Sequence, residues 1–148
     1  MRKILQIGTK GQLGWELLRT CAPLGEVIAL DFPAVDLSDV AGLRELIRTT
    51  KPDIILNAAA YTNVDKAESE PELVRAINAI GPGVLAEEAK KIDAVLMHYS
   101  TDYVFDGTKG SPYVETDIPN PLNVYGHTKL EGEQTIAASG CAYLVLRS

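Results

Sequence analysis

The chain has 148 residues, of which 46% are hydrophobic and 23% are charged, the composition of one globular domain with its own core. Its formal net charge of −6 argues against nucleic acid or an anionic membrane as the main partner. The two cysteines lack the spacing of a metal site, so we expect a reduced, cytoplasmic compartment. We expect no signal peptide and no membrane span.

Apolar runs of strand length alternate with helical patterns along the chain, as in consecutive βαβ units. The predicted strands cover residues 3–8, 26–30, 53–59, 94–100 and 142–148. Several are almost continuously apolar, which favours a parallel sheet covered on both faces. We therefore predict an α/β fold of Rossmann type, a doubly wound parallel sheet of about five strands in the order 3-2-1-4-5, as one domain over residues 1–148.

Helices are predicted between the strands, over residues 12–21, after Ser38, after Pro71 and over residues 124–138. Pro82, in the sequence Gly-Pro-Gly at 81–83, should kink or break the third of these helices because proline has no backbone N–H. Residues 59–70 and 106–123 resist assignment, and a loop as long as the second is usually functional. The chain ends after its last strand, so we expect it to be the amino-terminal portion of a longer protein.

Three glycines, Gly8, Gly11 and Gly14, follow the first strand and open a helix. This spacing allows a tight turn and a close approach of a pyrophosphate to the helix N-terminus, although a plain glycine-rich turn would look the same. Asp31, at the end of the second strand, can accept hydrogen bonds from an adenosine ribose, unless it is only a solvated strand end. The combination predicts a dinucleotide site. Asp31 favours NAD, whereas Lys10 could offset its charge and admit NADP.

Further candidates follow the later strands. Asp36 and Leu37 could flank an adenine, although Asp36 could equally cap a helix. The small alanines in residues 57–65 would let a flat ligand lie against the backbone, or simply allow close packing. Ser100 and Thr101 place two hydroxyls where the fourth strand ends; they could bind a substrate carbonyl or cap the strand end.

Tyr125 and Lys129 are four residues apart and share one face of a predicted helix. A free phenol, with a pKa of about 10, is a poor acid at neutral pH, but a nearby ammonium group lowers that pKa. Such a tyrosine can donate a proton to a ketone oxygen as a hydride reaches the carbon. The same spacing also occurs on ordinary helix faces, so it indicates catalysis only in combination with the other motifs. Gly126 would let a cofactor or substrate come close.

In this order the motifs resemble those of the extended short-chain dehydrogenase/reductases, and most closely the dTDP-4-dehydrorhamnose reductase family. The strings "GQLGWEL", "NAAAYTNVDKAESEPE", "HYSTDYVFDG" and "PLNVYGHTKLEGE" carry the resemblance, which covers essentially the whole chain. It implies reduction of the nucleotide sugar dTDP-4-dehydro-L-rhamnose to dTDP-L-rhamnose with NADPH or NADH. Because the family's substrate domain is absent, we expect this chain to bind cofactor but to be inactive alone.

The resemblance also implies a role for each matching residue. Thr101 would orient the sugar carbonyl, Tyr125 would donate the proton, and Lys129 would lower the Tyr125 pKa and hold the nicotinamide ribose. The cofactor would in addition contact the glycine loop, the second strand end and the segment after the third strand, at Gly8, Thr9, Lys10, Gly11, Gln12, Leu13, Gly14, Asp31, Asp36, Leu37, Ala58, Ala59, Ala60 and Tyr61. The substrate would contact Ser100, Thr101, Asp102, Tyr103 and Tyr125.

Some members of this family dimerise through a magnesium ion, bound in part by a glutamate that matches Glu16, so the resemblance implies a homodimer of the full-length protein. The other magnesium ligands would lie beyond Ser148. Two alternatives stay open: an epimerase or dehydratase of the same superfamily, and a non-catalytic nucleotide-binding regulatory subunit. A dehydratase is disfavoured because no glutamate follows Asp102. The regulatory subunit is disfavoured because all three candidate catalytic residues are present.

Overall fold

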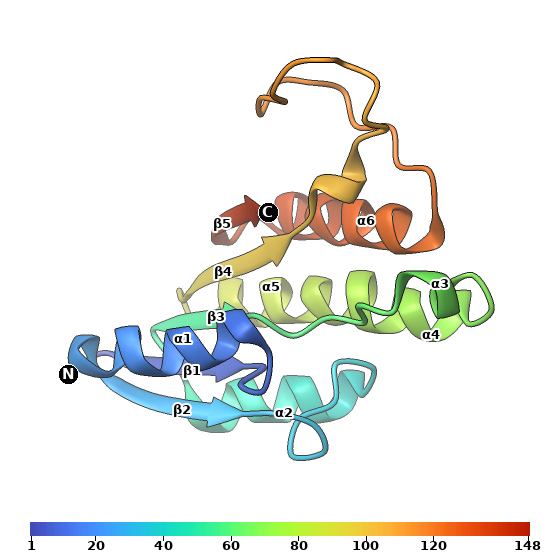
Figure 1. Cartoon of the computed structure of the whole chain (residues 1–148). Coiled ribbons are helices and arrows are strands. Elements are labelled where there is room, and N and C mark those ends of the chain that lie inside the picture. Colours follow the sequence, from blue (N-terminus) through green and yellow to red (C-terminus); the bar gives the residue numbers. More distant parts are fainter.

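The computed structural model describes residues 1–148 and confirms the α/β fold (Figure 1). Five strands form one sheet in which every neighbouring pair is parallel. The strands are β1 (Lys3–Ile7), β2 (Glu26–Leu30), β3 (Ile54–Asn57), β4 (Val95–Ser100) and β5 (Ala142–Arg147). All five predicted strands are therefore present, and together with their helices they make a Rossmann-like, doubly wound domain.

The predicted strand order is wrong for the third strand. The observed order is β2-β1-β3-β4-β5, so β3 pairs with β1 on the side away from β2. The reason lies in burial: β3 is the apolar run Ile54 to Leu56 and is mostly buried, whereas β2 is half-exposed throughout, as expected of an edge strand. The turns over residues 31–39 add no strand beyond β2. Helix α2 (Val40–Thr50) then leads back to the other side of β1.

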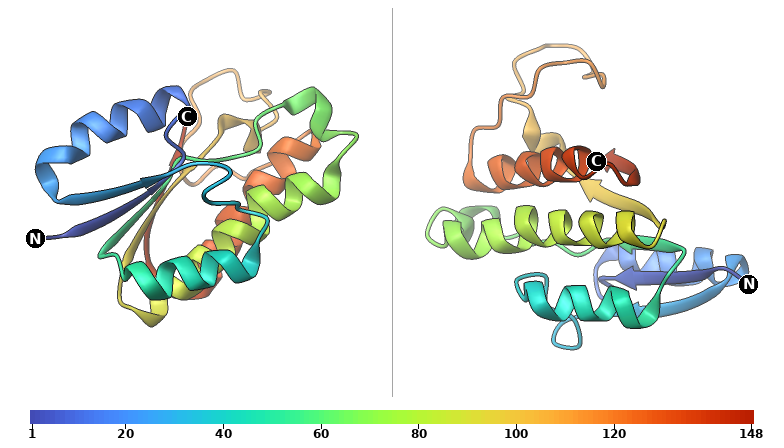
Figure 2. Two further views of the ribbon diagram at one scale, coloured as in Figure 1. Left: turned by 90° about the horizontal axis from the view of Figure 1, so that it is seen from below. Right: turned by 180° about the vertical axis from the view of Figure 1, so that it is seen from behind.

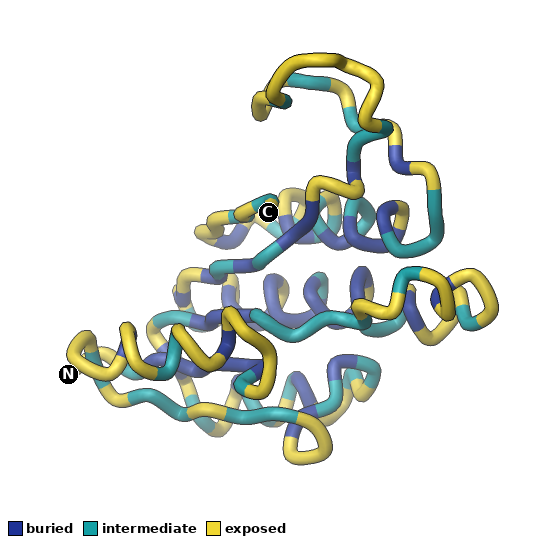
Figure 3. The backbone as a smooth tube through the Cα atoms, viewed as in Figure 1, coloured by how far each residue is buried: buried dark blue, intermediate teal, exposed yellow.

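Helices cover the two faces of the sheet unequally (Figure 2). Helix α1 (Gln12–Cys21) lies alone on one face, while α2, α5 (Gly81–Lys91) and α6 (Val124–Ser139) lie side by side on the other. The main core of 15 buried residues lies between the sheet and the three helices α2, α5 and α6, and it includes Leu5, Ile55 and Leu96 of the central strands. The tube in Figure 3 shows this burial along the inner strands and the inner sides of α5 and α6. None of the helices combines the length and apolar character needed to cross a bilayer.

The expected break at Pro82 does not occur. After α3 (Val64–Ala67), helix α4 (Pro71–Arg75) passes through a π-helical segment, η2 (Ala76–Ile80), directly into α5. The Gly81 N–H donates to the carbonyl of Ala76, five residues back, and this wider turn places Pro82 in the first turn of α5, where no N–H is needed. Gly81 is also tightly packed, since a Cβ there would lie 2.5 Å from the Leu37 carbonyl oxygen.

Helix α6 carries the predicted Tyr–Lys pair and has well-defined ends. The Asn123 side chain accepts a hydrogen bond of 2.7 Å from the Gly126 N–H and caps the first turn. Gly140, with φ of +73°, terminates the helix, as predicted. Two short 3₁₀ turns, η1 (Ala22–Leu24) and η3 (Asp102–Val104), complete the fold. The carboxyl ends of the five parallel strands all lie at the same edge of the sheet, and α6 begins near that edge.

Candidate functional site

The glycine loop joins β1 to α1 at the carboxyl edge, next to the start of the segment that leaves β3. Chain order reverses between β1 and β3, the position where open α/β sheets bind ligands. Gly8 has a φ of +89°, and a Cβ there would lie 2.7 Å from the Ala59 nitrogen. A Cβ at Gly14 would lie 2.2 Å from the Gly8 carbonyl oxygen. The fold therefore requires glycine at both positions.

Gly11 differs from the other two glycines. A Cβ at this position would meet no atom within 4 Å, so packing within the chain gives no reason for a glycine. Gly11 is also the N-cap of α1, and it lines a hollow of about 500 Å³ together with Lys10, Gln12, Trp15 and Glu16. An open backbone at a helix N-terminus suits an anionic group that must approach closely.

Gln6 supports the loop from below, and the sequence analysis missed it. Its buried side-chain amide donates to the carbonyl oxygens of Gly8, at 3.1 Å, and Gly14, at 2.7 Å. The sequence did contain a signal for Gln6, because it is the one polar residue within the apolar run from Ile4 to Ile7.

Asp31 lies beside the loop, as predicted, and braces it. One carboxylate oxygen accepts hydrogen bonds from the backbone N–H groups of Thr9, at 2.6 Å, and Lys10, at 3.0 Å. Partial burial raises the pKa of Asp31, but these hydrogen bonds outweigh it, so the pKa lies below its ordinary value. The Lys10 ammonium group lies 3.8 Å from the other carboxylate oxygen. Lys10 is thus close enough to offset the charge of Asp31.

The remaining predicted cofactor residues divide into two groups. Asp36 accepts two hydrogen bonds from Ser38 at one carboxylate oxygen, and Leu37 belongs to the buried core; contact of these residues with an adenine stays a prediction. The cap of α2 is Asp39, not Ser38.

The second group comprises the half-buried residues that follow β3 along the same edge, Ala58, Ala59, Ala60 and Tyr61. The side chain of Asn78 in η2 fixes the end of this segment, bonding to both the N–H and the carbonyl of Tyr61. The Tyr61 hydroxyl is itself engaged, donating to Glu70 at 2.7 Å. The alanines thus run as a small-residue strip between the glycine loop and η2.

The predicted substrate residues follow β4. Ser100 is buried, and its hydroxyl has no hydrogen-bond partner. Thr101 is also buried, but its hydroxyl accepts from the Tyr103 N–H at 3.1 Å and donates to Asp102 at 3.3 Å, so it caps η3. The ring of Tyr103 packs edge-on against that of Tyr125, with 5.4 Å between centroids. The structure therefore brings β4's end and the start of α6 into direct contact.

Tyr125 is half-buried in the first turn of α6. Burial raises the pKa of Tyr125 above its ordinary value, and the neighbouring Thr101 hydroxyl only partly opposes this. The expected lowering of the Tyr125 pKa by Lys129 is therefore not seen in this structure. The reason is the direction of the lysine: its ammonium group donates at 2.6 Å to the carbonyl of Tyr99.

Lys129 is only 2% exposed, and burial lowers its pKa to about 8. Besides the Tyr99 carbonyl, its Nζ lies 3.3 Å from Nε2 of the buried His98. His98 in turn lies 3.1 Å, from its Nδ1, from the amide nitrogen of Asn57 on β3. The sequence analysis missed His98, although an ionisable residue in the middle of a strand predicted to be buried was a usable signal.

Glu16 is not surrounded by other side chains that could bind a metal ion. It is exposed and forms an ion pair of 2.6 Å with Arg19 of the same helix. No group of three or more histidine, cysteine, aspartate or glutamate side chains in the structure is arranged to hold a metal ion. The residues present therefore do not support the expected magnesium site.

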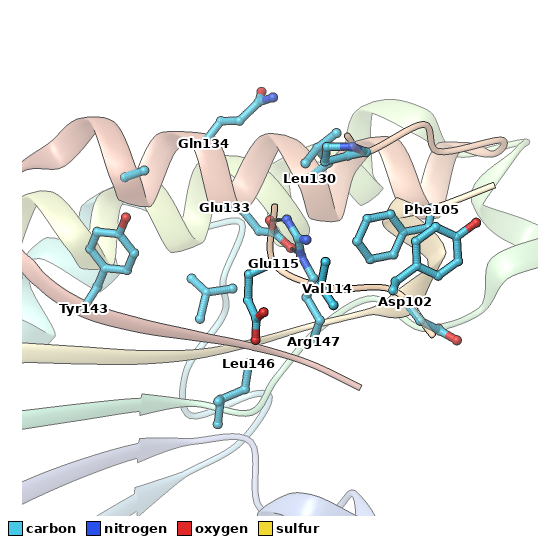
Figure 4. Close-up of a pocket in the computed structure, with 14 residues that line it drawn as sticks. Asp102, Phe105, Val114, Glu115, Leu130, Glu133, Gln134, Tyr143, Leu146 and Arg147 are labelled. Atoms are coloured by element: carbon cyan, nitrogen blue, oxygen red, sulfur yellow. Dashed lines mark hydrogen bonds and ion pairs between the residues drawn. The ribbon is translucent and has the colours of Figure 1, made fainter. Parts of the chain in front are cut away.

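A second, larger hollow of about 780 Å³ lies between α6, β5 and the loop after η3 (Figure 4). Its centre is the ion pair of Arg147 with Glu133, which point toward one another from β5 and α6. Asp102 lines one side, but neither Tyr125, Lys129 nor the glycine loop contributes. The hollow is therefore separate from the predicted cofactor site.

Comparison with known proteins connects these features to one family. The model of the RmlD substrate binding domain family matches residues 1–148. A dTDP-4-dehydrorhamnose reductase of Burkholderia thailandensis is 47% identical over 146 residues, which is 99% of this chain and 49% of that protein.

Solved structures agree with this result. The dTDP-4-dehydrorhamnose reductase of Clostridium acetobutylicum superposes with a TM-score of 0.94 at 41% identity, covering 98% of this chain and 52% of that one. The corresponding enzyme of Bacillus anthracis, solved in complex with NADP, gives a TM-score of 0.93 at 34% identity, covering 99% and 52%. The chain spans about half the length of the curated relatives it matches.

Proposed function

Because the chain belongs to the RmlD substrate binding domain family, we propose that it is the cofactor-binding part of an NADPH- or NADH-dependent reductase of nucleotide sugars. The proposed substrate of the whole enzyme is dTDP-4-dehydro-L-rhamnose, whose 4-keto group becomes the hydroxyl of dTDP-L-rhamnose. The observation that carries the proposal is Gly11, a glycine with open space where its side chain would be, at the N-terminus of α1.

The glycine loop fits a dinucleotide pyrophosphate. Gly8 and Gly14 shape the turn, Gln6 fixes it from below, and the N–H groups of Gln12 and Leu13 open α1, where the helix dipole favours an anion. Asp31 would bind the adenosine ribose. The nearby Lys10 ammonium group would reduce repulsion of a 2′-phosphate, which supports the use of NADPH as well as NADH.

The catalytic residues of the proposal are Thr101, Tyr125 and Lys129. When bound, the reduced nicotinamide supplies the two electrons that a ketone reduction requires. Tyr125, whose phenol is protonated at neutral pH, would give its hydroxyl proton to the ketone oxygen. Thr101 would orient that oxygen, and Lys129 would stabilise the tyrosinate and bind the nicotinamide ribose. Ser100 offers the substrate a buried hydroxyl without a partner.

One observation favours the non-catalytic alternative. Lys129 is turned toward β4 and donates to the Tyr99 carbonyl, so it is not arranged with Thr101 and Tyr125 for proton transfer in this structure. We propose that the 148-residue chain binds cofactor but does not turn over alone. A regulatory subunit would behave in the same way when joined to the remainder of a full-length protein, whereas a reductase would gain activity.

The cofactor assignment is tested by fluorescence titration of the purified chain with NADPH and with NADH. We expect both to bind, and Gly11→Val to abolish binding while the chain stays folded, because the added side chain fills only open space. Ala41→Val, which places the same valine side chain at an exposed position of α2, is the control and should bind normally. If neither cofactor binds at millimolar concentration, or if Gly11→Val binds like the original chain, the assignment is wrong.

A further inference from the structure

Three buried polar side chains from three separate elements form a row beneath the candidate catalytic residues. Asn57 of β3, His98 of β4 and Lys129 of α6 are 1%, 1% and 2% exposed. The Asn57 amide nitrogen lies 3.1 Å from His98 Nδ1, and His98 Nε2 lies 3.3 Å from Lys129 Nζ. Water does not reach these groups, so each must find its hydrogen-bond partners within the row or in the adjacent backbone.

The sheet itself sets the first contact in the row. Asn57 and His98 are direct partners in the register of β3 and β4, so their side chains stand next to each other on one face of the sheet. Helix α6 packs on β4 and inserts Lys129 from above. The carbonyl of Tyr99, the residue after His98, takes one ammonium proton at 2.6 Å. His98 therefore contacts both Lys129 and Asn57 of β3.

The imidazole can serve Lys129 in either charge state, but only by changing tautomer. A charged lysine only donates, so Nε2 must then accept, and the ring proton sits on Nδ1 and bonds to the Asn57 amide oxygen. A neutral lysine can accept, so Nε2 can then carry the proton while Nδ1 accepts from the Asn57 amide N–H. The Asn57 side chain supplies either partner by a half-turn of its amide; in the donor orientation its Oδ1 also accepts from the Ala59 N–H at 3.3 Å, a bond that the half-turn breaks. Both ring nitrogens of His98 thus have a hydrogen-bond partner in either charge state of Lys129.

Burial and the neighbouring ammonium group keep the His98 ring neutral. Burial lowers the pKa of His98 well below its ordinary value, and the Lys129 ammonium group lowers it further. For Lys129, burial lowers the pKa to about 8, opposed by Glu133 one turn further along α6, which is itself paired with Arg147. Of the groups that act on the row, only Lys129 thus has a pKa close to neutral pH.

We propose that His98, oriented by Asn57, is a positioning residue that holds Lys129 at the carboxyl end of β4 and follows its charge by exchanging tautomers. The proposal rests on the proposed function, because it assigns His98 its purpose through Lys129. It adds a residue outside the Thr101, Tyr125 and Lys129 set. The consequence is that both ring nitrogens of His98 stay paired when Lys129 loses its proton, so Lys129 can change charge without leaving its place.

The direct test is nitrogen-15 NMR of the histidine rings in the intact chain between pH 6 and pH 10. The chain has only two histidines, and the exposed His127 is an internal reference. We expect His98 Nε2 to change from unprotonated to protonated as pH rises through about 8, without passing through an imidazolium. In Lys129→Met the ring should keep one tautomer throughout. A single His98 tautomer over this range in the original chain would overturn the proposal.

A second measurement links the row to the cofactor. We expect His98→Leu to move the midpoint of the pH dependence of NADPH affinity by about one unit, because Lys129 loses a partner. His98→Gln, whose amide can both donate and accept, should move it back toward the original, and the control His127→Gln should leave it unchanged. Equal midpoints in all variants would contradict the role of His98. If no chain binds NADPH, the proposed function fails, while the tautomer measurement still decides whether the row behaves as proposed.

Discussion

The glycine loop and the first turns of α6 lie at the same edge of the sheet, yet different kinds of group hold them in place. The loop is shaped by backbone: two glycines whose Cβ positions are blocked, an amide beneath and the Asp31 carboxylate beside it. The α6 region is shaped by buried side chains, above all Lys129 against His98 and the Tyr99 carbonyl. The stability of the glycine loop should therefore depend mainly on substitutions that change side-chain size. The α6 region should depend mainly on substitutions that change charge, and on pH.

The largest expected effect comes from Gly14→Ala. The new methyl group would lie 2.2 Å from the Gly8 carbonyl oxygen, and both atoms belong to rigid backbone. We expect a loss of about 4 to 5 kcal/mol in the free energy of unfolding, measured by urea denaturation. Gly11→Ala, the matched control with open space around it, should cost about 1 kcal/mol or less. Equal costs for the two variants would contradict the division of roles within the loop.

Glu88 is a buried charge outside the candidate site, and it tests how much a paired buried charge stabilises the fold. Glu88 of α5 is 1% exposed and pairs with Arg44, Arg48 and Lys91, and the hydrogen bonds, with Arg48 foremost, lower its pKa to about 2. We expect Glu88→Gln to cost about 3 kcal/mol, because Arg48 and Lys91 lose their carboxylate partner and Arg44 keeps only Glu87. The exposed Glu87→Gln is the control and should cost about 0.5 kcal/mol or less.

The pH dependence of stability gives a further check on Glu88. Its folded-state pKa lies below the ordinary value of 4.5, so its contribution is present above pH 4.5 and is lost as pH falls toward about 2. Glu88→Gln should lack this loss. Identical acid denaturation of the variant and the original chain would rule out Glu88 as its source.

Lys129→Met should change the free energy of unfolding in the opposite direction from Glu88→Gln. Lys129 is buried without a carboxylate partner, and its pKa falls from 10.5 to about 8 on folding. Between these values the unfolded chain binds more protons, so the original chain gains stability as pH rises through this window. We expect the variant to be about 1 to 2 kcal/mol more stable at pH 7 and to lack that rise. Thermal unfolding at pH 7 and pH 10 measures both effects, and a less stable variant at pH 7 would show that Lys129 stabilises the fold.

The smallest effect is expected for Asp31→Asn. Its carboxylate accepts hydrogen bonds from the Thr9 and Lys10 backbone, so the substitution should cost about 1 kcal/mol in unfolding free energy. Removing the negative charge should also strengthen NADPH binding relative to NADH, since a 2′-phosphate is no longer repelled. Competitive titration with the two cofactors measures the ratio. An unchanged ratio would separate Asp31 from cofactor choice.

Several features of the site were predictable because they depend on neighbours in the chain. The spacing of Gly8, Gly11 and Gly14 after an apolar strand predicted the loop, and Asp31 indeed lies beside it. Asn123 and Gly140 mark the ends of α6 through cap chemistry that involves only adjacent residues. The predicted helix break at Pro82 was wrong because a π-helical turn, itself packed against α6, accommodates the proline.

Local patterns of apolar, glycine and cap residues thus determined which segments became strands, helices and the glycine loop. Folding alone decided that β3 lies beside β1, since strand order depends on which strands most need burial on both sides. It also decided that His98 meets Lys129, because that contact joins β4 to a helix 31 positions further along the chain. Partners that depend on sheet register and helix packing leave no periodic trace in the chain, which is why the tuning of Lys129 became visible only in three dimensions.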